Sequence, residues 1–272
     1  MKVKHLGLVF SVFILSCGGM RGLYDGERSD MLQQSLQGEQ ILRDSIMTHL
    51  PQAIQKYLRV SGHVGKPIPY NCEIHWKESF IKLKRDAEWG ELNIEQFNSV
   101  QPIGRISFME FDSMPVKGRD IYIGGYGEMK GKLFNLLTVV EGSGPEISQS
   151  AMIVAFAEFP IIPGYVFSKN VVWDTIDSVT VRATLQESGF SVTGLFHFDE
   201  EGLYKRFETN DRFFQNEDGV NKNFPYTTVI HSYQEQGDLL IPHEMSAVWN
   251  LPNEDFEYFK GSLDRLEFNV NE

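Results

Sequence analysis

Hydrophobic and polar residues alternate along most of the second half of the chain, with the period of two that is typical of β-strands with one buried face. Short runs rich in glycine and acidic residues interrupt the alternation at 187–189, 199–202 and 236–238. Such runs are typical of tight turns between antiparallel strands. The pattern therefore predicts a meander of six strands: Val179–Gln186, Phe190–Phe198, Leu203–Phe214, Phe224–Glu235, Leu239–Leu251 and Leu263–Phe268.

Shorter segments in the first half also have strand character. In Ile106–Asp112, Phe108 and Glu110 fall on one face and Met109 and Phe111 on the other. The segments predicted to be strands are Cys72–Trp76, Phe80–Arg85, Ile106–Asp112, Asp120–Met129 and Lys132–Glu141.

Two regions have the three- to five-residue spacing of apolar positions that is typical of helices. The first runs from Leu36 to Leu50, and Pro51 then suits the first turn of a second helix that ends at Leu58. The other, Glu146–Phe159, is apolar on almost all sides and is flanked by prolines, so we expect it to be buried or to cover a cavity. Helices and strands together predict an α+β domain with one dominant antiparallel sheet.

The N-terminus has the pattern of an export signal. Lys2 and Lys4 precede the apolar run 6–15, which is too short to span a bilayer, and Cys17 follows shortly afterwards. Residues 14–17 resemble the bacterial lipobox, in which the cysteine becomes the lipidated first residue; an ordinary secretory cleavage site is the alternative. The lipobox predicts a protein anchored by lipid in the bacterial cell envelope and facing the periplasm. The absence of aspartate after Cys17 favours the outer membrane.

Residues 18–35 are polar and rich in glycine. Such a composition predicts a flexible tether that reaches roughly 25 Å. The chain is therefore predicted to consist of a signal peptide (1–17), a tether (18–35) and a single α+β domain (36–272).

Charge and cysteine content narrow the classes of partner. The formal net charge is −12 and the sequence contains no extended basic patch, so it disfavours nucleic acid as a partner. Cys72 is the only cysteine besides Cys17, and we expect it to be a small buried residue in a strand.

The sequence lacks the common signatures of catalysis and cofactor binding. It has no phosphate loop, no G-x-S-x-G nucleophile motif and no H-E-x-x-H metal motif. His197, His231 and His243 fall on predicted strands, but their spacing requires no metal. We therefore expect neither a cofactor nor a metal site, and the sequence favours a binding protein over an enzyme.

Glu158 is the most unusual polar residue, because it lies in the apolar segment 155–160. A buried carboxylate needs a partner, since an unpaired one costs several kcal/mol. One interpretation is an ion pair with Arg182 or Arg206, and the other is a polar group inside a ligand cavity. Glu244, which follows Pro242 and His243, is a second candidate of the same kind.

Aromatic residues recur along the meander. Ordinary core packing is one explanation, and a curved sheet that encloses an apolar pocket, with the helix around Phe156 as a lid, is the other. The candidate pocket residues are Phe156, Glu158, His197, Arg206, His231, Glu244 and Trp249.

Local patterns across residues 48–270 resemble a bacterial family of unassigned function. They comprise Leu50-Pro51 through Tyr57-Leu58, Trp89 with Glu95-Gln96-Phe97, Ala157-Glu158-Phe159-Pro160, Trp173-Asp174 with Asp177, Ala183-Thr184-Leu185, Phe198 through Gly202, and Ile241-Pro242 with Trp249. The order of elements also looks like the half-barrel of periplasmic lipoprotein carriers, which hold acyl chains on an aromatic-rich concave face under helices. This resemblance implies a large curved antiparallel sheet with N-terminal helices and one internal buried helix.

Three functions remain open from the sequence. The favoured one is an envelope lipoprotein that binds a lipid or another apolar small molecule in a concave sheet. A hydrolase that uses Glu158 with a histidine such as His231 or His243 is the second. A module that docks another envelope protein through an exposed apolar patch is the third.

Overall fold

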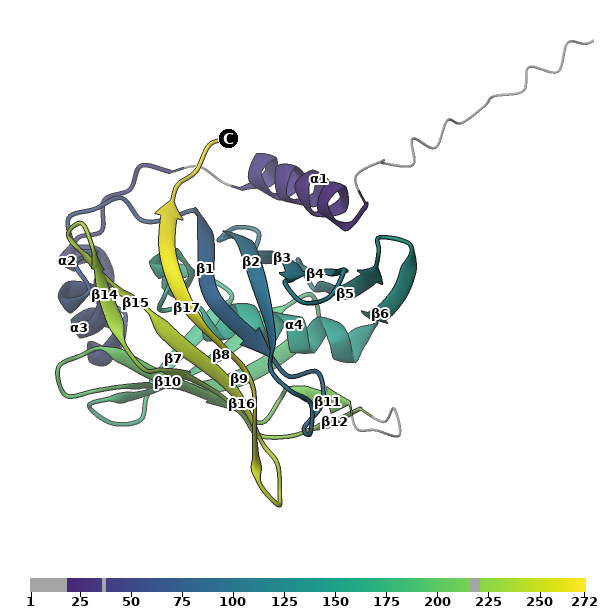
Figure 1. The fold of residues 1–272 in the computed structure, drawn as a ribbon. Coiled ribbons are helices and arrows are strands. Elements are labelled where there is room, and N and C mark those ends of the chain that lie inside the picture. Colours follow the sequence, from purple (N-terminus) through teal and green to yellow (C-terminus); the bar gives the residue numbers. More distant parts are fainter. Residues whose placement is uncertain (1–18, 36–37, 216–220) are drawn as a thin grey trace, which may run out of the picture.

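The computed structural model describes residues 19–35, 38–215 and 221–272 (Figure 1). The expected signal peptide and Cys17 lie outside these residues. One antiparallel sheet of 13 strands dominates the fold, in the order β6-β5-β4-β3-β2-β1-β17-β16-β13-β10-β9-β8-β7. Its strands are β1 (Asn71–Ile81), β2 (Gly90–Ser99), β3 (Gly104–Phe111), β4 (Val116–Ile123), β5 (Tyr126–Leu133), β6 (Leu137–Ser143), β7 (Val171–Thr175), β8 (Thr180–Glu187), β9 (Phe190–Phe198), β10 (Tyr204–Thr209), β13 (Tyr226–Ile230), β16 (Glu244–Asn250) and β17 (Asp255–Phe268).

The first and the last strand of the chain pair with each other in the middle of the sheet. β1 pairs with β17, in a register that places Cys72 opposite Phe268, so the first six strands and the later meander form one continuous surface. β6 and β7 are the two edges, and the sheet is therefore an open curved one. Two small hairpins lie beside it: β11 (Phe213–Gln215) with β12 (Asn221–Asn223), and β14 (Tyr233–Gln236) with β15 (Leu239–Pro242).

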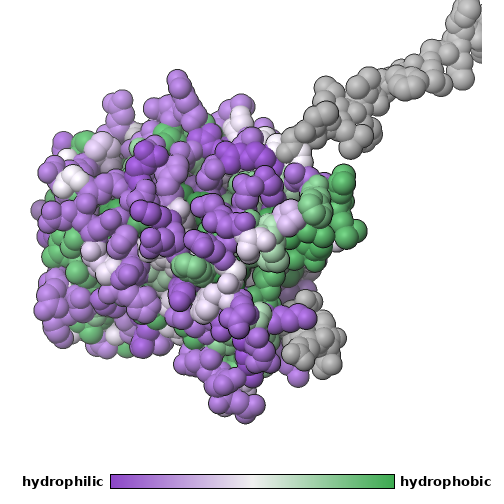
Figure 2. All heavy atoms as spheres, viewed as in Figure 1, coloured by the Kyte–Doolittle hydropathy of each residue, from purple (hydrophilic) through white to green (hydrophobic). Residues whose placement is uncertain are grey.

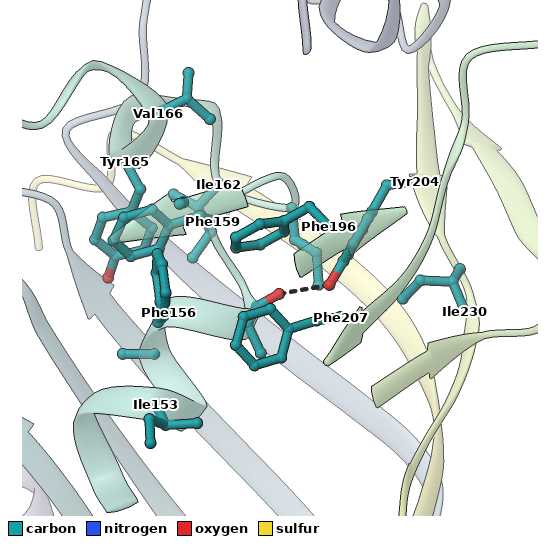
Figure 3. Close-up of a cluster of buried hydrophobic side chains, with 14 of the residues drawn as sticks. Ile153, Phe156, Phe159, Ile162, Tyr165, Val166, Phe196, Tyr204, Phe207 and Ile230 are labelled. Carbon is teal, nitrogen blue, oxygen red and sulfur yellow. Dashed lines mark hydrogen bonds between the residues drawn. The ribbon is translucent and has the colours of Figure 1, made fainter. Parts of the chain in front are cut away.

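Helix α4 (Pro145–Ala157) lies inside the curve of the sheet, where it contacts β4, β5 and β9 (Figure 1). Its C-terminal end carries Phe156, which makes edge-on contacts with Phe159, Phe196 and Phe207 (Figure 3). The Tyr204 hydroxyl donates to the Ala157 carbonyl at 3.0 Å. A 3-10 helix, η1 (Pro163–Phe167), completes this core. The predicted α+β fold with a curved sheet and an internal buried helix is confirmed.

Helix α1 (Gly19–Gln34) occupies the region predicted to be a flexible tether, so that prediction is wrong. The helix packs on the convex face of β2–β4, where Met20, Tyr24 and Met31 are buried in a second apolar cluster with Phe97 and Phe108, among others. Apolar residues four and seven positions apart share one face of a helix. The surrounding glycines and charges hide this pattern in the sequence.

The region from residue 38 to 60 is less helical than predicted. Only α2 (Asp44–Met47) and α3 (Gln52–Val60) form, and Pro51 precedes α3 instead of lying in its first turn. Ile41 makes an antiparallel bridge with Pro67, so the segment before α2 is extended. The apolar side chains that predicted a helix over 36–50 reach the core from an extended segment and from the single turn α2, whereas the second predicted helix forms as α3.

Several predicted strand boundaries are also wrong. Asp120–Met129 is divided by a turn at Gly124 and Gly125, both at positive φ, which glycine adopts without strain. Lys132–Glu141 is likewise divided, and the three longest segments of the predicted meander, Leu203–Phe214, Phe224–Glu235 and Leu239–Leu251, each contain a break. β2 was not predicted at all. The turns at 187–189, 199–202 and 236–238 and the buried Cys72 in β1 are confirmed.

His63 follows α3 and is almost completely buried, with its ring edge-on to Phe268 at 5.8 Å. Burial, together with the charge of Lys66, lowers the pKa of His63 to about 4. The unfolded chain, with a histidine pKa of about 6.5, takes up the proton first as the pH falls. We expect this group to contribute full stability above pH 6.5 and to lose about 3 kcal/mol of it between pH 6.5 and 4.

Urea unfolding of the parent and of His63→Leu at pH 7 and pH 4.5 tests this expectation. The parent should lose more stability than the variant over this interval. An equal loss in both proteins would show that His63 does not cause the acid sensitivity.

Candidate functional site

A cavity of about 190 Å³ lies between the concave face of the sheet and α4. β1–β5 line one side of it, and β13, β16 and β17 line the other. The apolar side chains of its wall are Trp76, Ile81, Leu92, Ile94, Met109, Met129, Val154, Ala157, Tyr226, Met245, Ala247, Tyr258 and Phe259. Polar residues of the wall include Gln96, Arg105, Asp120, Glu158 and Arg212.

The alternation of β2 explains how polar groups reach the cavity. Gln96 and Asn98 point to the concave side, whereas Glu95 and Phe97 point outward beneath α1. Both faces of β2 are covered over residues 96–99, so the polar residues on the inner face there must be hydrogen-bonded.

Glu158 accepts hydrogen bonds from three side chains. Gln96 Nε2 lies 2.9 Å from its Oε2, Asn98 Nδ2 lies 2.9 Å from the same oxygen, and Arg105 Nε lies 2.9 Å from its Oε1. The carboxylate is thereby paired with a charge and bound by two amides, as a buried charge requires. Asn98 also donates to the hydroxyl of Tyr165 at 3.3 Å.

Arg105, on β3, is the charge partner that the sequence did not identify. Besides Glu158 it binds Asp120 at 3.2 Å and donates to Gln96 Oε1 at 3.1 Å. Burial alone would lower the pKa of Arg105, but the carboxylates of Glu158 and Asp120 outweigh this effect and raise it. The expected ion pair of Glu158 with Arg182 or Arg206 is therefore wrong, because β3 brings Arg105 to the carboxylate instead.

Arg212, in the segment between β10 and β11, also contributes to the cavity wall. Its neighbours are aromatic rings, whereas those of Arg105 are carboxylates. Its guanidinium lies 4.1 Å from the ring centre of Tyr226 and 4.7 Å from that of Trp249, and Nη1 donates to the Tyr258 hydroxyl at 2.8 Å. Within the described part of the chain no carboxylate pairs with it, and its buried Nε has no hydrogen-bond partner. Arg212 is therefore a cation in an aromatic cage with a spare donor.

Two of the aromatic candidates do not line the cavity directly. Phe156 has no exposed surface and belongs to the closed core of Figure 3, so its predicted place in a pocket is wrong. Trp249 lies beneath Arg212 and packs against Phe214 and Tyr226. The aromatic content of the meander therefore serves mainly the core.

His197 and Arg206 lie on the outer face of the meander, away from α4. His197 Nε2 is 3.2 Å from Glu208 Oε2, and Arg206 pairs with the same glutamate at 2.9 Å. A depression of about 680 Å³ lies on this face, lined mainly by polar residues that include Arg206 and Arg182. It is larger than the inner cavity and more open, and several of its polar groups already bind one another, as Arg206 binds Glu208 and Thr227 binds Asn250.

His231 and Glu244 also lie outside the inner cavity. His231 Nε2 is 2.8 Å from the hydroxyl of Ser246, and Glu244 accepts from Ser232 at 2.9 Å. Both line a shallow depression near the ends of β13 and β16. None of the hydrogen bonds of Glu158 reaches a histidine, so the described residues offer no acid–base pair of the expected kind.

A carboxylate–histidine group on the convex face was not predicted. Glu73, His75 and Glu267 lie close enough to share a cation. Arg28 binds Glu73, and Arg265 binds both His75 and Glu267. The guanidinium groups of Arg28 and Arg265 therefore already balance the charge of these carboxylates.

Residues 40–261 match DUF6544, a family of unknown function. The chain belongs to this family. The matched region contains every residue of the cavity wall, whereas α1 precedes it. The sequence matches none of the curated proteins with which it was compared.

Solved structures resemble the DUF6544 chain at low identity. An outer membrane lipoprotein-sorting protein domain from Vibrio parahaemolyticus shares 11% identity over 80% of this chain and 92% of its own, with a TM-score of 0.44. A LolA superfamily protein from Nitrosomonas europaea shares 11% over 80% and 94%, with a TM-score of 0.43. A DUF1329 family protein from Desulfovibrio piger shares 10% over 81% and 93%, with a TM-score of 0.42. Similarity at this level carries no information about ligand or activity.

No helix among the described residues has the length and apolar character that a bilayer-spanning helix needs.

Proposed function

We propose that this DUF6544 protein binds an amphipathic small molecule, with an apolar chain and an anionic end, in the cavity between the sheet and α4. The observation that carries the proposal is a largely apolar cavity whose wall includes a caged arginine, of which one buried N–H group has no hydrogen-bond partner. Apolar pockets with a few placed polar groups are the usual form of small-molecule sites.

The volume of the cavity limits the size of the ligand. At about 190 Å³ the cavity lies below the roughly 300–1,000 Å³ of typical ligand pockets, so it accommodates only a short chain without movement. Met109, Met129 and Met245 line it, and methionine side chains repack readily around irregular ligands. Met129 is also exposed to solvent, so it lies at the rim where a longer chain would leave the cavity.

The two polar clusters would play different roles. Each nitrogen of Arg105 donates a hydrogen bond, to Glu158, Asp120 or Gln96, and two carboxylates already balance its charge. Arg212 has an N–H group without a hydrogen-bond partner, and the planar guanidinium suits a carboxylate or a phosphate. We therefore assign the anionic end of the ligand to Arg212 and a structural role to Glu158.

The cellular setting is part of the proposal. If Cys17 is lipidated, the domain works in the bacterial envelope, on the periplasmic side of a membrane, where the outer membrane is favoured. Lipids and other amphipathic molecules are abundant there, which fits a binding function better than a reaction.

Fluorescence titration of the full chain with cis-parinaric acid and its methyl ester tests the assignment. We expect saturable binding of the acid and weaker binding of the ester. Arg212→Gln should weaken binding of the acid about tenfold or more, because a hydrogen bond to a charged group contributes about 1.5–3 kcal/mol. Arg206→Gln, on the outer face, is the matched control and should leave it unchanged. Absence of saturable binding would contradict the proposal.

A further inference from the structure

The three large apolar side chains with the highest exposed fractions among the described residues lie together at the end of the β5–β6 hairpin. Leu136 is 85% exposed, Phe134 67% and Leu137 63%, and Met114 and Val139 are also exposed. The Phe134 amide donates to the Pro115 carbonyl, which joins the β3–β4 turn to the hairpin. We name Met114, Phe134, Leu136, Leu137 and Val139 the tip patch; Figure 2 shows its green surface at the right of the molecule.

The tip patch lies where soluble proteins normally place polar residues. Hairpin turns favour glycine and asparagine, yet here a phenylalanine at φ 52° precedes Asn135 at φ 58°. Edge strands are normally protected by charges, but β6 carries only one charged residue, Glu141. An apolar tip on an edge strand indicates a surface that another apolar phase covers.

The start of α1 fixes the position of the N-terminal segment relative to this patch. The backbone amide of Met20 donates to Asn135 Oδ1 at 3.2 Å, and Gly19 packs against the same side chain. Asn135 lies between Phe134 and Leu136. Cys17 is three residues before Met20, so the chain allows it at most about 11 Å from that amide. Attachment of Cys17 or of the apolar run 6–15 to a bilayer would hold the tip patch at the same bilayer.

Charges of both signs lie beside the patch, and Glu110, Asp112 and Lys117 share a shallow depression with Met114 and Phe134. Lys117 and Lys132 are direct cross-strand neighbours on β4 and β5. Lys117 pairs with Glu110, whereas within the described residues Lys132 has no carboxylate partner. Lysines next to apolar and aromatic side chains are typical of segments that lie at a membrane interface.

We propose that the tip patch inserts into the interfacial region of a lipid bilayer and fixes the orientation of the domain on it. β5 continues from the patch to Met129 on the cavity rim, so this orientation directs one rim of the cavity toward the membrane. The proposal does not depend on ligand binding, because it rests on the exposed residues and on the place where the chain enters α1.

Quenching of an added tryptophan by brominated lipids tests the insertion. The full chain is reconstituted into vesicles of phosphatidylethanolamine and phosphatidylglycerol that contain brominated phosphatidylcholine, and the emission of the parent is subtracted. For Leu136→Trp we expect the added emission to shift to the blue and to lose at least half its intensity to the brominated lipid. The matched control is Val172→Trp, at a residue 58% exposed on the opposite edge strand β7, and it should stay unquenched.

Two results would overturn the proposal. Unquenched Leu136→Trp emission at the wavelength of exposed tryptophan would show that the tip remains in water. A blue shift that is already present without vesicles and increases with protein concentration would show that a second copy of the chain covers the patch. Neither result would affect the parinaric acid titration, so the two proposals fail separately.

Discussion

Replacing Arg105 by methionine is expected to lower the free energy of unfolding by about 3–5 kcal/mol, the usual loss when one partner of a buried ion pair is removed. The side chain of Arg105 is 13% exposed and that of Glu158 9%, so water cannot replace the lost contacts fully. Glu158 and Asp120 would remain as neighbouring carboxylates without a counter-charge. Glu158→Gln should be destabilising for a related reason, because its new amide group would face the amide donors of Gln96 and Asn98.

Urea unfolding of the purified variants measures this effect. The matched control is Arg206→Met, which removes a half-exposed ion pair with Glu208 and should cost about 0–1 kcal/mol. The double variant Arg105→Met with Glu158→Leu should recover part of the loss, since two apolar side chains can replace a buried pair. Equal small losses for Arg105→Met and Arg206→Met would contradict the buried cluster.

Replacing Ala247 by phenylalanine is expected to weaken ligand binding at least tenfold, which corresponds to about 1.4 kcal/mol. Ala247 is buried, lines the cavity and lies opposite Thr228 and Phe259 on the neighbouring strands. A phenyl ring there would occupy much of the 190 Å³. Because the ring enters existing space, we expect a stability cost at or below the roughly 1–3 kcal/mol of overpacking.

The next residue provides the control for this variant. Val248 lines the depression on the outer face of the sheet, so Val248→Phe adds similar bulk on the wrong side of β16. Titration with cis-parinaric acid should give the parent affinity for Val248→Phe and weakened binding for Ala247→Phe. The same affinity in both variants would place the ligand elsewhere.

Most of the meander could be predicted because its turns and strands are determined by residues that are close in sequence. The turns near Gly189, Gly202 and Gly237 place glycine at positive φ, and the strands between them have one polar and one buried face. The helix over 145–157 could be predicted for the same reason, since its apolar residues are continuous in sequence. Elements of this kind depend little on distant parts of the chain.

β2 and α1 could not be predicted because each depends on the other. On the outer face of β2, Phe97 is buried because α1 covers it. On the inner face, Gln96 and Asn98 can be buried because they bind Glu158, about sixty residues later. Without these partners the sequence of β2 is typical of a polar loop. The sequence of α1 predicts a tether, because its three buried residues are separated by charged residues and glycines.

The candidate site could be predicted only in part for a related reason. An acidic residue in an apolar segment identified Glu158, but its partner Arg105 lies 53 residues earlier and is brought near by strand pairing. Arg212 gave no signal, because its cage is assembled from Tyr226, Trp249 and Tyr258 on three strands. Glu244 shares β16 with cavity residues but lies on another surface of the sheet. His197 and Arg206 lie on β9 and β10, which do not line the cavity, and His231 follows the end of β13.

Native mass spectrometry of the full chain, extracted with its lipids from the membranes of a bacterial host, tests the central claim most directly. We predict one bound amphipathic molecule per chain in the parent and in Val248→Phe, and loss of that molecule in Ala247→Phe. The comparison separates a ligand in the cavity from lipid that adheres to the surface. A parent without bound mass, or Ala247→Phe with the same occupancy as the parent, would contradict a ligand cavity between the sheet and α4.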